Sequence, residues 1–309
     1  MSVFESSPSN HTLVGLTYSE YVPGLLTANP RLIDYVEIAF EQLLQTPEVG
    51  VLWHDVPVVL HCASLSLAGN VPPTSALAEK LDYWVKKTGT PWLGEHLAYV
   101  RSDGRYRDIA EHSAATPASD LIHSDFLVDG TPFNIGYTVS PQLSASVLDR
   151  VLKASAAWEA KLKRPVLLEN GPFYFAMPGS TMSQVEFINA LCEHRSEARL
   201  LLDLSHLAIT CSNLSLDPFE TLIALPLDRV VEVHVSGARE EDGMVWDDHT
   251  LPAPALVFEL FDRLMTVAQP KAVTLEYNWD AAFPVEAVIR DVGRLRQIIA
   301  DRLPEVTRL

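Results

Sequence analysis

Short apolar segments recur along the chain at intervals that suit strands alternating with helices. Eight of them are rich in Val, Ile and Leu, are too short for ordinary helices, and are predicted as strands: Leu13–Thr17, Tyr35–Ala39, Pro57–His61, Trp92–Ala98, Val166–Glu169, Leu200–Leu204, Arg229–Val235 and Ala272–Tyr277. Six longer segments carry apolar residues at spacings of three and four, which predicts helices: Ala76–Lys87, Gln142–Leu162, Ser183–Glu193, Asp217–Leu225, Ala253–Ala268 and Pro284–Leu303.

This alternation predicts an α/β protein with parallel strands, because strands separated by helices return in the same direction. Eight strand and helix units in a chain of 309 residues suit a single (β/α)8 TIM barrel, for which roughly 250 residues is typical. We expect one domain over residues 1–309, with the barrel at about 12–303. Its functional groups should lie at the carboxyl ends of the strands.

One segment, at about 101–141, breaks the alternation. It is polar, is rich in Ser, Asp, Gly and Pro, and includes His112, His123 and the pair Ser119-Asp120 without a clear period. A long loop inside a compact domain often has a function. Because this segment follows the fourth strand, we expect a lid-like loop over the carboxyl ends, and an excursion packed on the barrel rim is the alternative.

Composition and charge narrow the class of protein. Hydrophobic residues make up 48% of the chain, no apolar stretch approaches the roughly 20 residues that span a bilayer, and we expect a cytoplasmic protein without membrane contact. The net charge of −17 argues against a nucleic-acid partner, which would require clustered Lys and Arg. Cys62, Cys192 and Cys211 lack Cys-x-x-Cys spacing, so neither disulfides nor a thiolate zinc site is predicted.

Ionisable side chains close six of the apolar strand segments. A polar group at the end of a buried strand is unusual, and six strands ending in this way predict convergence on one site. Together with two neighbouring motifs, Asp203-x-x-His206 and Asp247-x-His249, they supply nine nitrogen and oxygen donors: His61, His96, Glu169, Asp203, His206, His234, Asp247, His249 and Glu276. Asp248 is the alternative to Asp247, and the spacing to His249 favours Asp247.

These donors predict a metal centre. Nine donors are enough for two or three ions that share bridging carboxylates, and so many carboxylates could not stay ionised together without cations. Imidazole and carboxylate donors without thiolate suit iron, manganese or zinc. The donor set by itself leaves the metal open.

Residues next to the donors are candidates for supporting roles. Glu95 precedes His96, so its side chain should point away from the barrel axis, and we expect it to support the site rather than to bind metal. Asn170 follows Glu169 and is expected to orient it. Further side chains at the strand ends are compatible with a pocket or with packing: Glu37, Glu41, Tyr18, Tyr277 and Trp279.

The same positions resemble a known family. The motifs that carry the likeness are Val59-Leu60-His61 with Ser64-Leu65-Ser66-Leu67, Glu95-His96-Leu97-Ala98, Leu168-Glu169-Asn170, Leu202-Asp203, Glu232-Val233-His234 and Leu275-Glu276. Their order and spacing resemble the multinuclear non-haem iron-dependent oxidative enzymes, from about Gly15 to Arg296. The donor order is also similar to that of the wider xylose-isomerase-like barrels, which include trinuclear-zinc apurinic-site endonucleases.

The resemblance implies an enzyme that oxidises a cysteine residue of a ribosomally synthesised precursor peptide, with dioxygen as co-substrate. It implies two or three irons in mixed Fe(II)/Fe(III) states, held by the nine donors, with an open position for the substrate thiolate and oxygen. Products in the family include β-carbon excision and an oxazolone with a thioamide. A small partner protein that presents the peptide is also implied.

Three motifs depart from the family pattern and indicate a divergent branch. The first strand lacks the usual Gly-x-Gly-Leu stretch, Leu204-Ser205 replaces paired asparagines after Asp203, and Glu276-Tyr277-Asn278 replaces Glu-x-Asp. The alternative function is a zinc- or manganese-dependent hydrolase or isomerase on the same barrel. The negative charge argues against a DNA substrate, and a sugar isomerase would usually place a lysine at a strand end, where this chain has none.

Overall fold

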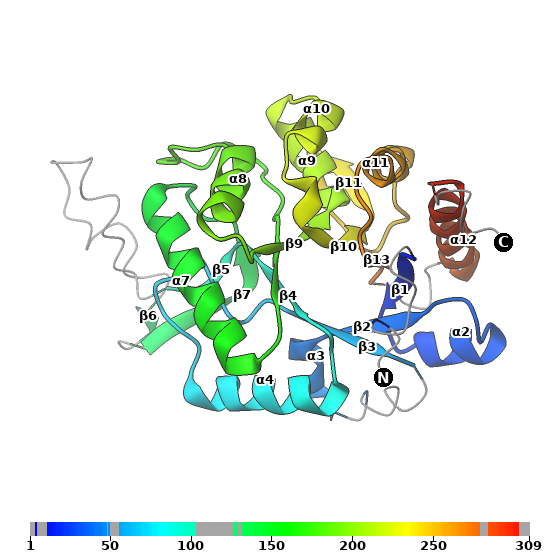
Figure 1. Cartoon of the computed structure of the whole chain (residues 1–309), viewed down its shortest axis with the longest axis horizontal. Coiled ribbons are helices and arrows are strands. Elements are labelled where there is room, and N and C mark those ends of the chain that lie inside the picture. Colours follow the sequence, from blue (N-terminus) through cyan, green and yellow to red (C-terminus); the bar gives the residue numbers. More distant parts are fainter. Residues whose placement is uncertain are drawn as a thin grey trace, which may run out of the picture.

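Eight parallel strands close into a barrel in the computed structural model of this chain, which describes residues 4, 11–47, 49, 56–102, 127–128, 131–278 and 284–302. The strands are β1 Leu13–Thr17, β2 Tyr35–Ala39, β3 Val58–Cys62, β4 Leu93–His96, β8 Val166–Glu169, β9 Arg199–Asp203, β10 Val230–Val235 and β13 Ala272–Leu275. They follow one another around the barrel in chain order, and β13 closes it by pairing with β1 (Figure 1). The predicted TIM-barrel fold is confirmed.

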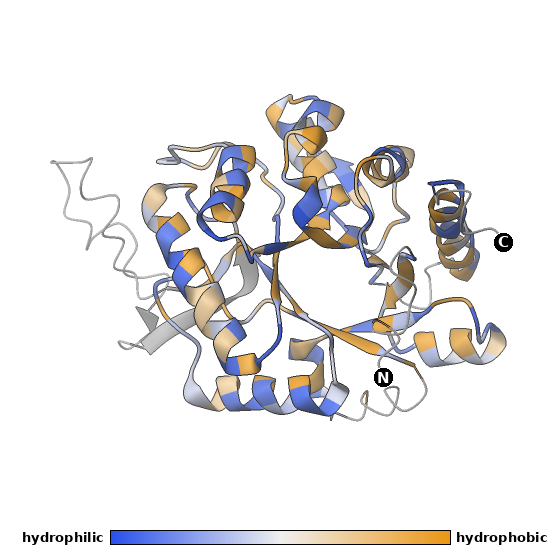
Figure 2. Ribbon diagram, viewed as in Figure 1, coloured by the Kyte–Doolittle hydropathy of each residue, from blue (hydrophilic) through white to orange (hydrophobic). Residues whose placement is uncertain are grey.

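Helices ring the barrel (Figure 1). The main ones are α2 Val22–Ala28, α3 Phe40–Gln45, α4 Ser75–Thr88, α7 Ala145–Leu162, α8 Gln184–His194, α9 Leu204–Leu214, α10 Pro218–Ile223, α11 Ala255–Met265 and α12 Val285–Arg302, with a short 3-10 helix at Leu227–Arg229. Figure 2 shows hydrophobic and hydrophilic positions mixed along these helices, as expected for elements with one buried face. No helix in the described ranges is long and apolar enough to cross a membrane.

The helix α9 has no counterpart among the predicted helices, and the reason lies at its start. Asp203 is the last residue of β9 and also caps α9, where its Oδ1 accepts a hydrogen bond of 2.7 Å from the backbone N–H of His206. The helix therefore begins without an intervening loop. The apolar residues of β9 run directly into those of α9, so the change of period is hard to detect in the sequence.

Alternation along the strands separates two apolar regions. Outward-facing strand residues such as Val58 and Leu60 pack with the helices in a large cluster that also contains Cys62. Inward-facing residues form a smaller cluster inside the barrel, with Tyr35 and Trp92 as its largest members. This inner cluster fills the barrel beside the polar strand ends, so the barrel is a packed core rather than a channel.

The segment after β4 contains strands that the loop predicted at about 101–141 did not include. Its described parts form an antiparallel sheet of β5 Tyr99–Ser102, β6 Leu127–Val128 and β7 Thr131–Val139, in the order β5-β7-β6. This pairing joins residues that are far apart in the sequence, so local composition does not reveal it. His112, His123 and the pair Ser119-Asp120 lie outside the described residues, and the lid role remains a prediction.

Candidate metal centre

The carboxyl ends of the strands bring all nine predicted donors into one region of the barrel mouth. Their positions are His61 in β3, His96 at the end of β4, Glu169 at the end of β8, Asp203 at the end of β9, His206 in α9, His234 in β10, Asp247 and His249 at and after β12 (Met244–Asp247), and Glu276 directly after β13. The strand β12 pairs with β11 (Ala238–Glu241) in an antiparallel hairpin. Asp247 therefore ends a strand, where the sequence predicted only a loop.

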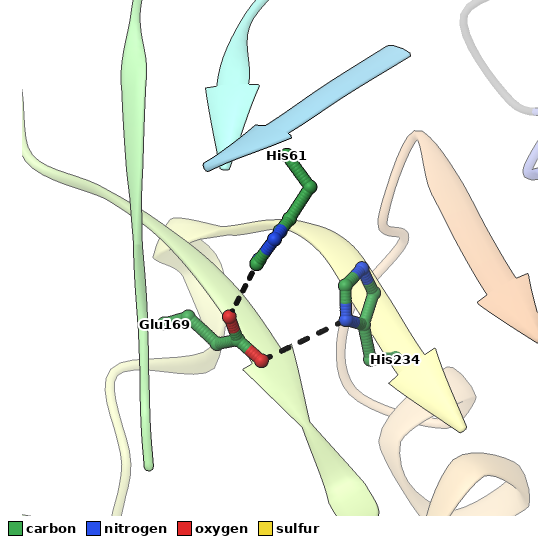
Figure 3. Close-up of side chains that lie close together, drawn as sticks. All are labelled: His61, Glu169 and His234. Carbon is green, nitrogen blue, oxygen red and sulfur yellow. Dashed lines mark hydrogen bonds and ion pairs between the residues drawn. The ribbon is translucent and has the colours of Figure 1, made fainter. Parts of the chain in front are cut away.

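Glu169 lies at the middle of this group. Its Oε2 is 2.7 Å from His61 Nε2 and 3.2 Å from His96 Nε2. Its Oε1 is 3.6 Å from His206 Nδ1 and 3.7 Å from His234 Nδ1. Figure 3 shows the carboxylate between His61 and His234, with one oxygen directed to each ring. A carboxylate placed in this way could bind two cations, one through each oxygen.

The remaining donors form two further groups around this carboxylate. Asp247 Oδ2 is 3.4 Å from His206 Nε2 and 3.0 Å from His249 Nε2. Glu276 Oε2 is 3.1 Å from His234 Nδ1, and Glu169, Asp203, His234 and Glu276 each offer one ligand atom within a common span of 4.8 Å. The geometry thus defines three adjacent sets of donors.

Burial and mutual charge shift the protonation of these groups. Burial alone would raise the pKa of Glu169, but His96 and His61 lower it to about 2. Burial lowers the pKa of His61, but the Glu169 carboxylate outweighs this effect and raises it to about 10. Burial raises the pKa of Asp203 to about 6. The carboxylates thus favour a positive charge on neighbouring imidazoles such as His61, and metal ions bound to these residues would supply positive charge instead.

The hydrogen-bond inventory tests whether these residues fit a metal. The buried atoms of the group that have no hydrogen-bond partner among the described residues include His96 Nδ1, Glu169 Oε1, Asp203 Oδ2 and Asp247 Oδ1. Buried polar atoms are normally paired, and several exceptions in one site indicate a missing ligand. The donors are all nitrogen or oxygen, and cations would satisfy the three carboxylate oxygens. The residues present therefore fit a multinuclear metal centre.

Asn170 differs from its expected role. Its Nδ2 donates to the Asp203 carbonyl and its Oδ1 accepts from the Asp203 N–H, both at 2.9 Å, so it holds Asp203 rather than Glu169. Its own carbonyl lies 2.8 Å from His206 Nδ1, which leaves Nε2 of that ring directed toward Asp247. Asn170 thereby orients two of the nine donors.

Glu95 points out of the barrel, as the strand alternation predicts. Its Oε2 accepts a hydrogen bond of 3.2 Å from the Leu65 N–H, and burial raises its pKa well above the usual range. Glu41 lies on the same outer side, where its Oε1 accepts hydrogen bonds from Ser64 Oγ at 2.5 Å and from Ala63 N at 3.1 Å. Both carboxylates support the chain that follows β3.

Glu37 belongs to the site, although the sequence left its role open. It is buried on the inner face of β2, and its Oε2 is 3.0 Å from His234 Nε2. The opposite ring nitrogen of His234 faces Glu169 and Glu276. A carboxylate behind a metal-binding imidazole fixes its tautomer and orientation. The alternation from Tyr35, which also faces inward, could have indicated this position.

Glu232 is a second inward carboxylate, placed two residues before His234. It accepts hydrogen bonds from Trp92 Nε1 at 2.6 Å and from Thr274 Oγ1 at 2.9 Å. Burial raises its pKa to about 7. The alternation in Val231-Glu232-Val233-His234 places both ionisable residues on the inner face, and this is the signal that could have identified Glu232.

A cavity of about 570 Å³ opens beside the donors His96, His206, Asp247 and His249. Its other walls come from the loop after β8, from Trp246 of β12, and from the chain around β5 and β7. No lysine or arginine occurs among the described residues that line it. This cavity gives a substrate access to the donor cluster from one side.

Two of the aromatic residues at the strand ends, Tyr18 and Tyr277, have packing roles, which was one of the two roles that the sequence left open. Tyr277 is buried, accepts a hydrogen bond of 2.7 Å from the Ala253 N–H and donates one of 2.8 Å to Asp291. It follows the inward-facing Glu276 and therefore points outward, between the barrel and α12. Tyr18 packs against the outer core, and Trp279 lies outside the described residues.

Relatives of known sequence resemble this chain over most of its length. The UPF0276 protein of Nitrosospira multiformis is 27% identical over 294 residues, which cover 93% of this chain and 93% of that protein. A UPF0276 protein of Streptomyces avermitilis is 29% identical over 271 residues, which cover 86% of this chain and 51% of that protein. This chain therefore spans about half the length of the Streptomyces relative.

Among solved structures, endonuclease IV from Thermus thermophilus superposes with a TM-score of 0.52 at 15% identity and covers 94% of this chain and 99% of that chain. A putative xylose isomerase from Rhodospirillum rubrum gives 0.52 at 13% identity, with the same coverage. These similarities show the shared barrel fold. The family model for the RiPP precursor modification enzyme MbnB/TglH/ChrH matches residues 13–114 and 141–300, which include all nine donors. The chain belongs to this family of enzymes that modify precursors of ribosomally synthesised peptides.

Proposed function

We propose that this protein oxidises a cysteine residue of a precursor peptide in a reaction that depends on iron and dioxygen. Membership of the family supports a precursor peptide as the substrate. The observation that carries the rest is the group of three adjacent donor sets, two of which share Glu169, beside a cavity lined by His96, His206, Asp247 and His249. The resemblance to multinuclear non-haem iron enzymes is the reason to choose iron and cysteine.

Each donor set would hold one ion. The first set consists of His61, Glu169 and His234, and His96 Nε2 lies 3.2 Å from the Glu169 carboxylate of this set. The second set consists of Glu169, Asp203, His234 and Glu276, and the third of His206, Asp247 and His249. Iron bound there would supply the capacity to accept electrons and to bind dioxygen and a thiolate side by side.

The residues of this chain would then control access and orientation. Glu169, Asp203 and His234 are completely buried, so the inner side of the centre is closed to water. His206 and Asp247 line the cavity, so the peptide would approach from their side. The cavity walls lack cationic side chains in the described ranges, which favours a substrate without a phosphate group. A small partner protein that presents the peptide is part of the proposal.

The test begins with protein purified without oxygen. Metal analysis should find two or three irons per chain, and Mössbauer or electron paramagnetic resonance spectra should show coupled, mixed-valent ions. Addition of dioxygen and a cysteine-containing precursor peptide should change the peptide mass, whereas the Cys→Ala peptide should stay unchanged. Stoichiometric zinc, with no turnover gained on iron loading, would instead support the hydrolase or isomerase alternative.

Glu37→Gln should weaken metal binding without unfolding the barrel. The amide is a poorer acceptor for His234 Nε2–H than the carboxylate 3.0 Å away, so the imidazole becomes less basic and less well oriented. Losses of about 10- to 100-fold in metal affinity are typical for such partners. Competition with a chelator measures the affinity. Glu41→Gln, outside the barrel, is the matched control and should bind metal like the wild type; unchanged affinity in Glu37→Gln would refute the assignment.

A further inference from the structure

Two large aromatic side chains next to the donor cluster are unusually exposed. Phe175 in the loop after β8 is 56% exposed, and Trp246 of β12 is 38% exposed. Both line the cavity that reaches His206, Asp247 and His249. Apolar side chains grouped at a cavity commonly mark a binding surface, whereas single exposed ones do not.

The aromatic wall is assembled from two separate parts of the chain. The rings of Tyr174 and Trp246 are in contact, with centroids 4.7 Å apart and planes inclined by 33°. The strand that carries Trp246 is held to α9 by Asn213, whose side chain donates to the Val245 carbonyl at 2.8 Å and accepts from the Val245 N–H at 2.9 Å. The wall therefore has a defined position relative to the donors.

The chemistry of the cavity specifies its occupant. Among its described lining residues, the groups that carry or readily acquire charge near neutral pH are Asp247 and three histidines, all of them proposed metal ligands. With these on metal, the rest of the cavity offers aromatic rings, Met177, short apolar residues and Ser140, whose hydroxyl donates to the Pro172 carbonyl at 2.9 Å. Its volume of about 570 Å³ lies in the range of ordinary ligand sites.

We propose that this aromatic wall, formed by Tyr174, Phe175, Met177 and Trp246, binds a large apolar or aromatic side chain that flanks the reacting cysteine in the peptide. The inference rests on the proposed function for the identity of the substrate. The flanking side chain stacks on the wall, and this contact places the cysteine thiol at the donors His206, Asp247 and His249. Trp246 directly precedes the proposed ligand Asp247, so the backbone fixes the position of the aromatic wall relative to this donor.

Binding without turnover tests the wall separately from the oxidase proposal. The full chain, loaded with zinc so that no oxidation can occur, is titrated with the blocked peptides Gly-Phe-Cys-Gly and Gly-Cys-Phe-Gly, and with their Phe→Ala counterparts. At least one phenylalanine peptide should bind about 10-fold more tightly than its alanine counterpart, because an aromatic ring leaves water and meets a stacked partner. Equal affinities, or no binding of any of these peptides at millimolar concentration, would overturn the proposal.

Variants of the aromatic wall test whether these side chains cause the preference for the phenylalanine peptides. Trp246→Ala and Phe175→Ala should each remove most of the phenylalanine preference, measured as the ratio of the affinities for the phenylalanine and alanine peptides. Phe175 is 56% exposed and Trp246 38% exposed, and neither belongs to the apolar clusters of the barrel core. Tyr83→Ala, an aromatic that is 55% exposed on α4, is the matched control and should keep the preference. A preference that survives both wall variants would refute the site. Loss of oxidation with an intact binding preference would refute the oxidase function alone.

Discussion

Replacing Glu169 with glutamine should abolish turnover and remove most of the bound metal. This carboxylate lies within 3.7 Å of four imidazoles and belongs to two of the three donor sets. An amide cannot bridge two cations with two anionic oxygens. Removal of a residue that only orients a ligand typically lowers metal affinity or activity 10- to 100-fold. Removal of the ligand that two donor sets share should therefore lower metal affinity by more than about a hundredfold.

The measurement is iron content together with turnover of a cysteine peptide, and circular dichroism confirms that the barrel is folded. The third donor set, His206, Asp247 and His249, does not include Glu169, so up to one ion per chain should remain. Glu79→Gln on the exposed side of α4 is the matched control and should match the wild type in both measurements. Full iron content and turnover in Glu169→Gln would show that the Glu169 carboxylate does not bridge two metal ions.

Gly94→Ala should damage the stability of the barrel and the metal centre together. Gly94 pairs with His61 across β3 and β4, and an added Cβ would lie 2.7 Å from His61 Cδ2 and 2.9 Å from Leu201 Cδ1. Both distances are shorter than real contacts allow, so the imidazole must move away from its position beside Glu169. Overpacking of this kind typically costs about 1–3 kcal/mol of unfolding free energy.

Urea unfolding and metal analysis of the same sample measure both effects of Gly94→Ala. Gly293→Ala on α12 is the matched control, because nothing lies within 4 Å of its added Cβ. Alanine is the better helix former, so this control should gain about 0.5–1 kcal/mol and keep its metal. A Gly94→Ala protein with unchanged stability and metal content would show that the room above Gly94 is not needed by His61.

Local sequence patterns were sufficient to predict the barrel and the candidate metal ligands at the strand ends. The apolar strand segments and helical periods predicted every barrel strand to within about two residues, because burial of one face imposes its period on the local sequence. Donors such as His61 and Glu169 could be recognised because they interrupt apolar strands at one end. The starts of α9 and β12 were missed where one element runs into the next or where pairing is not local.

Other features depended on contacts between distant parts of the chain. The alternation from Tyr35 indicates that Glu37 faces inward, but its partner could be assigned only once barrel closure had brought its carboxylate to His234 of β10. The ring contact between Tyr174 and Trp246 joins the loop after β8 to the strand β12, and the two sequences carry no shared signal. The role of Asn170 likewise became clear only from its hydrogen bonds to Asp203.

The sequence by itself determined that this protein is a TIM barrel with nine side chains of the kinds that bind metals. Both signals, the hydrophobic period and the polar residues at strand ends, are local in the sequence. Only the tertiary structure decided which donors share an ion position, which carboxylates support them, and where the aromatic wall stands beside them. These arrangements depend on distances between side chains from separate strands and loops. Such distances are set when the barrel closes between β1 and β13, at opposite ends of the chain.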